Sequence, residues 1–167
     1  QEVFEGLKAF RGADGKVRLF RVEENAKRMI NSGEYLKMAV PSVELFTKAC
    51  IEAVKLNADY IPPYGSGASL YLRPMLIGVG PQVGVKPSAD YLFAVFVTPV
   101  GPYYKDGFNC IKVIIDYDHD RAAPKGTGHV KVGGNYAASL DSGEIAHQKG
   151  FASVIFLDPA TKQYIDE

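Results

Sequence analysis

Residues 121–136 cannot belong to one regular element, and they divide this sequence into two differently patterned parts. The letters are R-A-A-P-K-G-T-G-H-V-K-V-G-G-N-Y. A proline and two glycines break helical and strand periodicity in the first half, which is typical of a loop. Two adjacent glycines follow, where the backbone can turn sharply and another group can approach closely. The stretch therefore predicts a loop, a short apolar segment and a turn into a helix near Tyr136.

Lys131 stands between Val130 and Val132, which is an unusual setting for a cationic side chain. Burial would disfavour the charged form and lower the pKa of the lysine, turning an inert ammonium into an amine nucleophile. The same letters also fit an ordinary strand–turn–helix corner with a surface lysine. From these residues alone, both interpretations stay open.

The bulk composition excludes partners that are bound through overall charge. The 167 residues include 19 Lys and Arg and 19 Asp and Glu, so the formal net charge is zero and neither nucleic acid nor a membrane surface is an expected partner. No apolar run approaches the roughly 20 residues that span a bilayer. Neither the two cysteines, Cys50 and Cys110, nor the three histidines show metal-ligand spacing, so we expect no metal. The cysteines indicate reduced residues of a cytoplasmic protein.

Strand and helix patterns alternate before the 121–136 stretch. Residues 3–10 and 16–21 flank an Asp14-Gly15 turn signal and predict a hairpin, with Gly6 marking a bulge or a close contact. Residues 23–37 and 43–57 carry apolar side chains at helical spacing, and Ser42 is a plausible N-cap of the second helix.

Three further strands are predicted at residues 68–79, 91–98 and 109–117, and the run 91–98 is apolar enough for a central, buried strand. Residues 137–149 predict a helix closed by Gly150. A strand over 151–157, a turn at Asp158-Pro159 and a strand from residue 163 follow.

Together these patterns predict an α+β fold with a mixed, mainly antiparallel sheet flanked by helices. We expect a small domain over residues 1–117, an interdomain loop over 118–130 in which Arg121 is structural, and the beginning of a second domain over 131–167. Neither end of the sequence shows capping or turn chemistry, so we expect a fragment of a longer subunit.

Arg73 is a permanent cation in the apolar run 68–79. It needs an anionic partner, because an unpaired buried charge is strongly destabilising. A carboxylate in the core would make this a structural salt bridge, whereas a phosphate would match the guanidinium fork. Both partners stay open at this point.

The string R-A-A-P-x-G-T-G-x-x-K-V-G-G-N-Y resembles the active-site segment of the branched-chain amino acid aminotransferases, pyridoxal-phosphate enzymes of fold type IV. The K-x-G-G-N-Y portion is specific to that family. The segments V-F-E-G-x-K-A-F, L-Y-L-R-P and Y-I-D-E are also similar to the family, so the resemblance runs along nearly all of the sequence. It implies that an N-terminal piece and most of a second domain lie outside the sequence.

The resemblance also implies roles for four cofactor-binding residues. Lys131 would be the catalytic residue, forming the Schiff base with pyridoxal 5'-phosphate, and Tyr136 would hydrogen-bond the ring oxygen of the cofactor. Arg73 would grip the phosphate, and Glu167 would pair with the pyridine nitrogen. Asp166 is the alternative to Glu167, although it should point to the opposite face of its strand.

Two aromatic residues are implied to line the substrate pocket. Phe4 belongs to the V-F-E-G segment, and Tyr103 follows the letters P-V-G-x. A phenylalanine on a strand is also an ordinary core residue, so that alternative stays open for Phe4. Tyr104 and Lys105 are expected to face solvent.

The activity implied is transamination of leucine, isoleucine and valine with 2-oxoglutarate by a cytoplasmic homodimer, whose partners are amino acids and 2-oxo acids. The preference among the three substrates is not readable, because one methylene is worth only about 1–3 kcal/mol in a pocket. One alternative is another enzyme of this fold, a D-amino acid transaminase or an aminodeoxychorismate lyase. The other is an inactive binding or assembly module, and we expect the fragment alone to be inactive.

Overall fold

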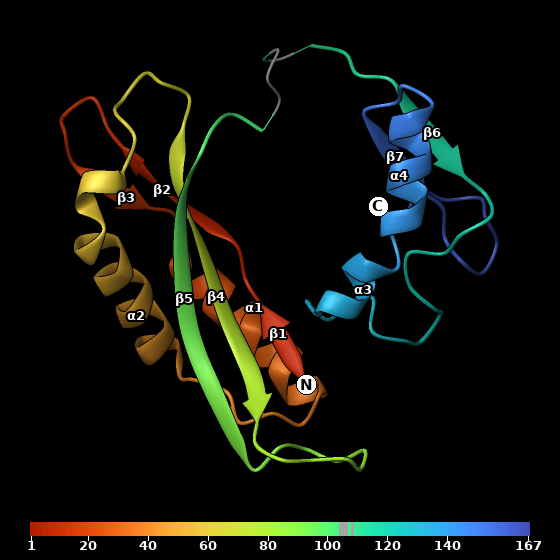
Figure 1. Ribbon diagram of the computed structural model, residues 1–167, viewed down its shortest axis with the longest axis horizontal. Helices are drawn as coiled ribbons and strands as arrows, with labels where there is room; N and C mark the ends of the chain where they lie inside the picture. Colours follow the sequence, from red (N-terminus) through yellow and green to blue (C-terminus); the bar gives the residue numbers. More distant parts are fainter. Residues whose placement is uncertain (104–106, 108) are drawn as a thin grey trace. The chain divides into compact units, whose positions relative to one another are not determined.

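The computed structural model describes residues 1–103, 107 and 109–167, which form two compact units, Gln1–Gly107 and Phe108–Glu167 (Figure 1). Tyr104 and Lys105, expected to face solvent, lie outside the described residues. The first unit ends about ten residues before the expected boundary at residue 117, because the strand at Val113–Asp116 pairs within the second unit.

The first unit is built on an antiparallel sheet, which confirms the predicted fold class. The long strand β4 is its centre: β5 pairs along one side, β1 and β2 pair in succession along the other, and β3 extends β2. The strands are β1 (Glu2–Phe4), β2 (Leu7–Arg11), β3 (Val17–Leu19), β4 (Ser69–Val79) and β5 (Asp90–Val100).

The single strand predicted over residues 3–10 is divided into β1 and β2 without a change of register. Phe4 faces Met75 and Leu7 faces Leu72, so both strands continue one alignment along β4. Pro74 lies between these two contacts on β4 and has no backbone N–H to donate. The ladder is therefore interrupted at this point by a missing donor and not by a bulge.

The predicted hairpin is confirmed at β2 and β3, where Arg11 pairs with Val17. Gly15 has φ of 74° in the connecting turn, a left-handed conformation that glycine adopts without strain. The second strand ends at Leu19, earlier than residue 21, because the chain turns at Arg21 into the first helix.

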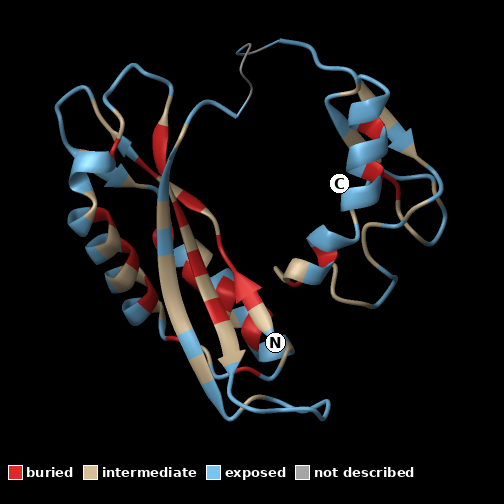
Figure 2. Cartoon of the chain, in the orientation of Figure 1, coloured by how far each residue is buried: buried red, intermediate tan, exposed pale blue. Residues whose placement is uncertain are grey.

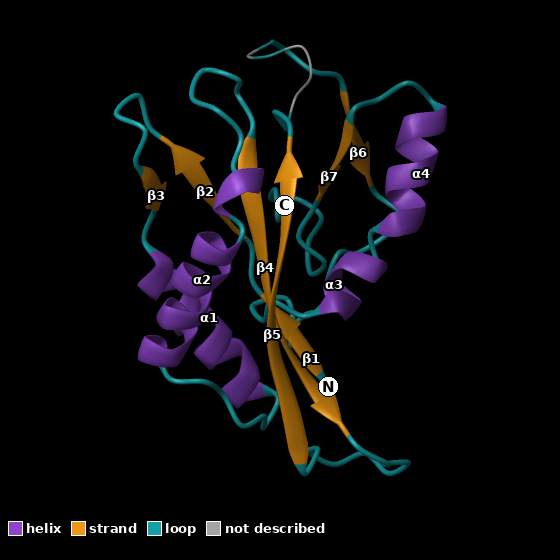
Figure 3. Cartoon of the chain, turned by 60° about the vertical axis from the view of Figure 1, so that its left-hand side comes forward, coloured by secondary structure: helices purple, strands orange, loops and turns teal. Residues whose placement is uncertain are grey.

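Helices α1 (Val22–Tyr35) and α2 (Val43–Leu56) cover one face of this sheet, and a short 3-10 helix, η1 (Ala58–Tyr60), follows (Figure 3). The Ser42 hydroxyl accepts a hydrogen bond of 3.1 Å from the backbone N–H of Leu45, which confirms the predicted N-cap. The predicted apolar stripes supply the core, with Ala26, Met29, Phe46 and Cys50 fully buried.

The prediction that the strand at 91–98 is central and buried is wrong. Among the described residues, β5 pairs with β4 alone and is an edge strand. Phe93 stacks on Phe46 of α2 at 5.8 Å between ring centroids, whereas Leu92 and Phe96 point away from the helices and are more than half exposed (Figure 2). A continuous apolar run indicates burial on both faces only where both faces are covered, and the helices cover one.

The second unit is a parallel pair of strands, β6 (Val113–Asp116) and β7 (Ser153–Phe156), joined by a crossover. The crossover contains helices α3 (Gly133–Ala137) and α4 (Leu140–Gln148), and α4 packs against both strands. The sequence predicted one helix over 137–149 and a strand from residue 109. The structure instead has two helices with a break at Ala138 and Ser139, and a shorter strand. Gly150, with φ of 79°, closes α4 as predicted.

Beyond β7 the chain folds back on itself. Leu157 and Ile165 form an antiparallel bridge, and the backbone N–H of Asp166 donates to the carbonyl of Phe156 at 2.9 Å. The strand predicted from residue 163 is therefore present as a single bridge. Among the described residues, no helix combines the length and the apolar character needed to cross a membrane.

Candidate active site

The amine of Lys131 and the hydroxyl of Tyr136 are in direct contact. The Lys131 Nζ donates to the Tyr136 oxygen at 2.6 Å and lies 4.8 Å from the centroid of the tyrosine ring. Lys131 is half-buried, although its neighbour Val130 is buried, so the full burial anticipated for this lysine is not found. The pair is reachable from solvent, because Tyr136 is 42% exposed.

The expected turn at Gly133 and Gly134 is instead the first turn of helix α3. Tyr136 consequently lies within a helix, where its side chain points back toward the N-terminal end of the element. Lys131 immediately precedes that end, so the helical path brings the hydroxyl to the amine. A Cβ at Gly134 would meet no atom within 4 Å, so this glycine leaves open space on the helix.

Asn135 fixes the loop that carries Lys131, a role that the sequence analysis missed. Its buried amide donates to the carbonyl of Thr127 at 2.7 Å and to the carbonyl of Val130 at 2.8 Å. The hydroxyl of Thr127 donates in return to the Asn135 Oδ1 at 2.9 Å. An asparagine directly after a glycine-rich loop was the available signal, because asparagine side chains readily bond nearby backbone groups.

Arg121 holds the two carboxylates that the sequence analysis compared for the pyridine role. Its Nε lies 2.6 Å from the Glu167 Oε2 and 3.2 Å from the Asp166 Oδ2. The expectation that Asp166 and Glu167 point apart is therefore not met, because both side chains reach one guanidinium. Arg121 is largely buried, and its Nη2 also donates to the carbonyl of Gly128, which supports its expected structural role.

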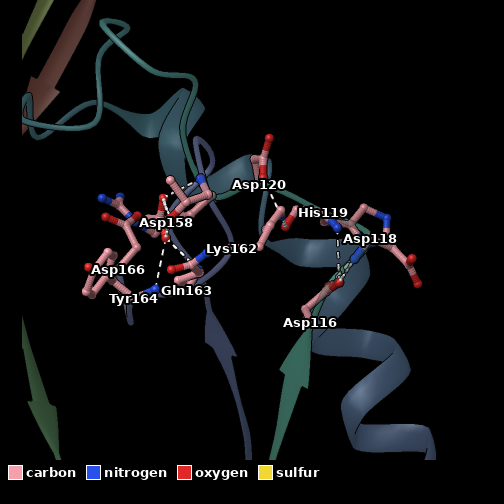
Figure 4. Close-up of polar contacts among 11 residues, drawn as sticks. Asp116, Asp118, His119, Asp120, Asp158, Lys162, Gln163, Tyr164 and Asp166 are labelled. Carbon is pink, nitrogen blue, oxygen red and sulfur yellow. Dashed lines mark hydrogen bonds and ion pairs between the residues drawn. The ribbon is translucent and has the colours of Figure 1, made fainter.

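The loops that follow β6 and β7 meet at one edge of this unit, as the carboxyl ends of neighbouring parallel strands must (Figure 4). Lys162, after β7, donates to the Asp120 carboxylate at 2.5 Å and to the His119 carbonyl at 3.2 Å. Ligand sites of parallel sheets lie at such edges, beyond the carboxyl ends of the strands.

Asp158 organises the second of these loops. Its carboxylate accepts backbone hydrogen bonds from Tyr164, Thr161 and Gln163 at 2.6 to 2.9 Å (Figure 4). These bonds, with the one from Tyr164 contributing most, hold the pKa of Asp158 well below its usual range. The predicted Asp158-Pro159 turn is thus a carboxylate-capped loop.

Asp116 ends β6 and caps the first loop in the same way. Its Oδ1 accepts from the backbone N–H groups of Asp118 and His119 at 2.8 and 3.0 Å, and its Oδ2 lies 3.0 Å from the His119 Nδ1. Burial alone would raise the pKa of Asp116. The neighbouring Ser142 hydroxyl and these contacts outweigh burial and hold the pKa at about 2.

In the first unit, Arg73 lies on the face of the sheet that the helices leave uncovered. Its Nη2 donates to the Tyr71 hydroxyl at 2.8 Å, and its guanidinium carbon lies 4.5 Å from the ring centroid of Phe4. Its Nε is buried without a hydrogen-bond partner, and no described carboxylate lies within ion-pair distance. The structural salt bridge considered for Arg73 is therefore absent among the described residues.

Phe4 is 7% exposed, as a core residue would be, and it also contacts Arg73. Gly6 permits this arrangement, since a Cβ at this position would come within 2.3 Å of the Tyr71 hydroxyl oxygen. The close contact expected at Gly6 is confirmed. Tyr103, the other predicted pocket residue, is 84% exposed, and its role stays a prediction.

The core carboxylate of this unit, Glu5, is paired with a different arginine, which the sequence analysis also missed. Arg28 of α1 reaches both Glu5 oxygens, through Nε at 2.6 Å and Nη2 at 2.7 Å, and Asn25 donates to one of them at 2.7 Å. Glu5 has no exposed surface. The bidentate arginine and the additional amide donor satisfy a charge that would otherwise be costly to bury.

The structure therefore brings Lys131 to Tyr136 in the second unit, and Arg73 to Phe4 in the first. It also places Glu167 against Arg121. A lysine, a tyrosine hydroxyl and a carboxylate in one unit, with an orphaned guanidinium nitrogen in the other, fit the amine, hydroxyl, acid and cation that pyridoxal phosphate requires of a protein.

Comparison with known proteins gives the same family as the sequence motifs. No protein-family model matches the chain. The branched-chain-amino-acid aminotransferase of Helicobacter pylori strain J99 is 55% identical over 168 residues, an alignment that covers 100% of this chain and 49% of that protein. The structure of a branched-chain amino acid aminotransferase from Escherichia coli is similar with a TM-score of 0.76 and 26% identity, covering 99% of this chain and 51% of that one.

A thermophilic relative, the T.th. branched-chain amino acid aminotransferase complexed with N-(5'-phosphopyridoxyl)-L-glutamate, gives a TM-score of 0.75 at 28% identity, covering 100% of this chain and 51% of that one. The chain thus spans about half the length of the curated relatives and solved structures that it matches. By sequence and by fold, it matches the branched-chain-amino-acid aminotransferase family over its whole length, as the sequence motifs predicted.

Proposed function

We propose that the protein to which this chain belongs transaminates branched-chain L-amino acids with 2-oxoglutarate, using pyridoxal 5'-phosphate. The observation that carries the proposal is the contact of 2.6 Å between Lys131 and Tyr136, within a chain that matches aminotransferases over its whole length. The cofactor, when bound, supplies an electron sink, and the protein supplies binding, orientation and charge.

Lys131 is the proposed attachment point of the cofactor and the proton carrier at the substrate α-carbon. An amine can form a covalent link to a carbonyl and, once released, can move a proton as a general base. Tyr136 holds this amine through its hydroxyl, which limits the positions that the Nζ can adopt. The Asn135 bonds to the Thr127 and Val130 carbonyls keep the loop, and so Lys131, in place.

Arg73 is proposed to bind an anionic oxygen group, because its Nε is buried and without a partner. The sequence prediction names the phosphate of the cofactor. The carboxylate of glutamate or 2-oxoglutarate has the same chemistry, and the T.th. structure holds a phosphopyridoxyl-glutamate adduct with both groups. The two sources are distinguishable, since loss of a phosphate contact weakens cofactor binding and loss of a carboxylate contact raises the KM for glutamate.

Glu167 is proposed to pair with the pyridine nitrogen. A carboxylate there favours the protonated ring, because an opposite charge nearby stabilises the cationic form. Arg121 would orient this carboxylate through its contact of 2.6 Å. Phe4 and Tyr103 are proposed to favour an uncharged, branched side chain in the substrate pocket. Cytoplasmic location and a homodimer complete the proposal.

The decisive experiment is borohydride reduction of the full-length protein, which fixes a cofactor to its lysine, followed by peptide mapping. We expect the pyridoxyl group on Lys131. Finding it on Lys125, the nearest lysine in the same loop, would overturn the assignment. The alternative D-amino acid transaminase would instead bleach the cofactor's visible band with D-alanine and leave it unchanged with L-leucine. The isolated 167-residue chain should show no turnover comparable with that of the full-length protein.

A further inference from the structure

A groove on the first unit lies outside the proposed active-site residues. It has a volume of about 500 Å³ and runs between β3, the beginning of α1 and the middle of α2. Its lining is mainly aliphatic, from Val17, Leu19, Val22, Ile51 and Val54. This volume is within the range of small-molecule sites, and such sites are typically apolar with a few placed polar groups.

The charged residues of this groove are predominantly cationic. Arg18, Arg21 and Lys55 line it together with one carboxylate, Glu23. Arg18 and Lys55 are engaged in ion pairs of 2.7 Å with other residues, whereas the nearest pair of Arg21 is long, at 3.8 Å to Glu24. Arg21 is therefore the cation best able to accept an anionic ligand.

One polar atom in the groove has no partner in the protein. The Oγ1 of Thr47, on α2, is buried and makes no hydrogen bond with any described residue. A threonine inside a helix normally bonds the carbonyl one turn earlier, so an unpaired hydroxyl here is costly unless something else binds it. An aliphatic surface, a cation and an unsatisfied hydroxyl thus converge on one groove.

We propose that this groove binds a small aliphatic carboxylate. The aliphatic part of the ligand covers Ile51, Val54 and their neighbours, the carboxylate is attracted by Arg21, and a ligand oxygen takes the hydrogen bond of Thr47. Branched-chain acids and short fatty acids share this chemistry, and the test below separates them. The proposal does not depend on the proposed transamination, because none of the residues assigned to that reaction lines the groove.

The experiment titrates the full-length protein with 4-methylvalerate while methyl NMR signals of Leu19 and Val54 are recorded. We expect saturable shifts of these signals. The uncharged amide of the same acid should shift them far less, since it cannot use Arg21. Octanoate is the second arm: tighter binding than 4-methylvalerate identifies a fatty acid, and weaker binding identifies a branched short-chain acid.

Three variants sharpen the test. Thr47→Val should weaken binding about tenfold without lowering the melting temperature, because it removes one hydrogen bond to a charged group and leaves no orphan. Ile51→Lys should abolish the shifts. Leu56→Lys is the matched control, since Leu56 lies on the same helix, is exposed and does not line the groove, and it should bind normally.

Two results would overturn the proposal. One is the absence of shifts at Leu19 and Val54 at millimolar acid, with transamination intact. The other is a change of oligomeric state in Ile51→Lys that Leu56→Lys does not show, because the groove would then be an interface between copies of the chain.

Discussion

The Nζ of Lys131 lies 2.6 Å from the hydroxyl oxygen of Tyr136, five positions later in the chain. Tyr136→Phe removes this hydrogen bond and keeps the ring. Because bonds to charged groups contribute about 1.5–3 kcal/mol, we expect kcat of the full-length protein to fall roughly 10- to 100-fold. The pyridoxyl label should stay on Lys131. Tyr117→Phe, at an exposed tyrosine of the same unit, should leave kcat unchanged, and equal losses in both variants would contradict the assignment.

Glu167→Gln keeps the shape of the side chain and removes its charge. If Glu167 pairs with the pyridine nitrogen, single-turnover rates with L-leucine should fall strongly while cofactor affinity falls less, because the carboxylate helps most in the transition state. Asp166→Asn should be milder, although both carboxylates contact Arg121. Should Asp166→Asn be the more damaging change, the roles of the two residues are reversed.

Gly6→Ala tests the arrangement around Arg73. The added Cβ would meet the Tyr71 hydroxyl at 2.3 Å, so that ring must move and its bond to Arg73 is lost. We expect weaker binding of cofactor or of glutamate, with the affected ligand identifying the anion that Arg73 binds. Gly143→Ala, where a Cβ meets nothing within 4 Å, is the control. Unchanged affinity for both ligands would remove Arg73 from the site.

Asn135→Ala leaves the buried carbonyls of Thr127 and Val130 without their donor. Each unsatisfied buried group costs about 1–3 kcal/mol, so denaturant unfolding of the full-length protein should show a loss in this range or above it. Thr127→Val removes one of these hydrogen bonds and should cost less. A larger loss in Thr127→Val than in Asn135→Ala would show that the amide is not the main fastener of the loop.

Asp116 predicts a contribution to stability in acid. Its pKa is about 2 when folded and about 3.9 in an unfolded chain, so its contribution is complete above the unfolded value and is lost as the pH falls toward 2. Unfolding free energies measured at about pH 5 and about pH 3 should therefore differ less in Asp116→Asn than in the parent protein. Asp59→Asn, at an exposed site, should retain the parent's difference.

Local chemistry made several elements of this fold predictable. The apolar spacing of α1 and α2, the Ser42 cap and the glycine of the β2–β3 turn depend on neighbours in sequence, and they were located to within a few residues. The edge position of β5 was not predictable, because it depends on which strands pair and which face the helices cover. The two-glycine start of α3 was missed since glycine weakens a helix, and here the context overrides that preference.

The candidate site shows the same division. Lys131 and Arg73 were identifiable because each is a cation in an apolar run. Asn135 and Glu5 were not, since their roles depend on partners that the fold brings near them. Glu5 lies more than twenty residues from Arg28 in sequence, and no local pattern links a strand glutamate to an arginine of the following helix.

The crossover between β6 and β7 also has a consequence for folding kinetics. Parallel strands pair only after the chain between them has closed a long loop, and such non-local contacts form slowly. The loop that carries Lys131 lies inside this crossover, and its neighbouring loop is tied to it by residues beyond β7, through Lys162 and Arg121. We therefore expect the lysine to reach its final environment late, after the antiparallel sheet of the first unit has formed. A nascent chain would then lack its reactive centre until β7 had been synthesised.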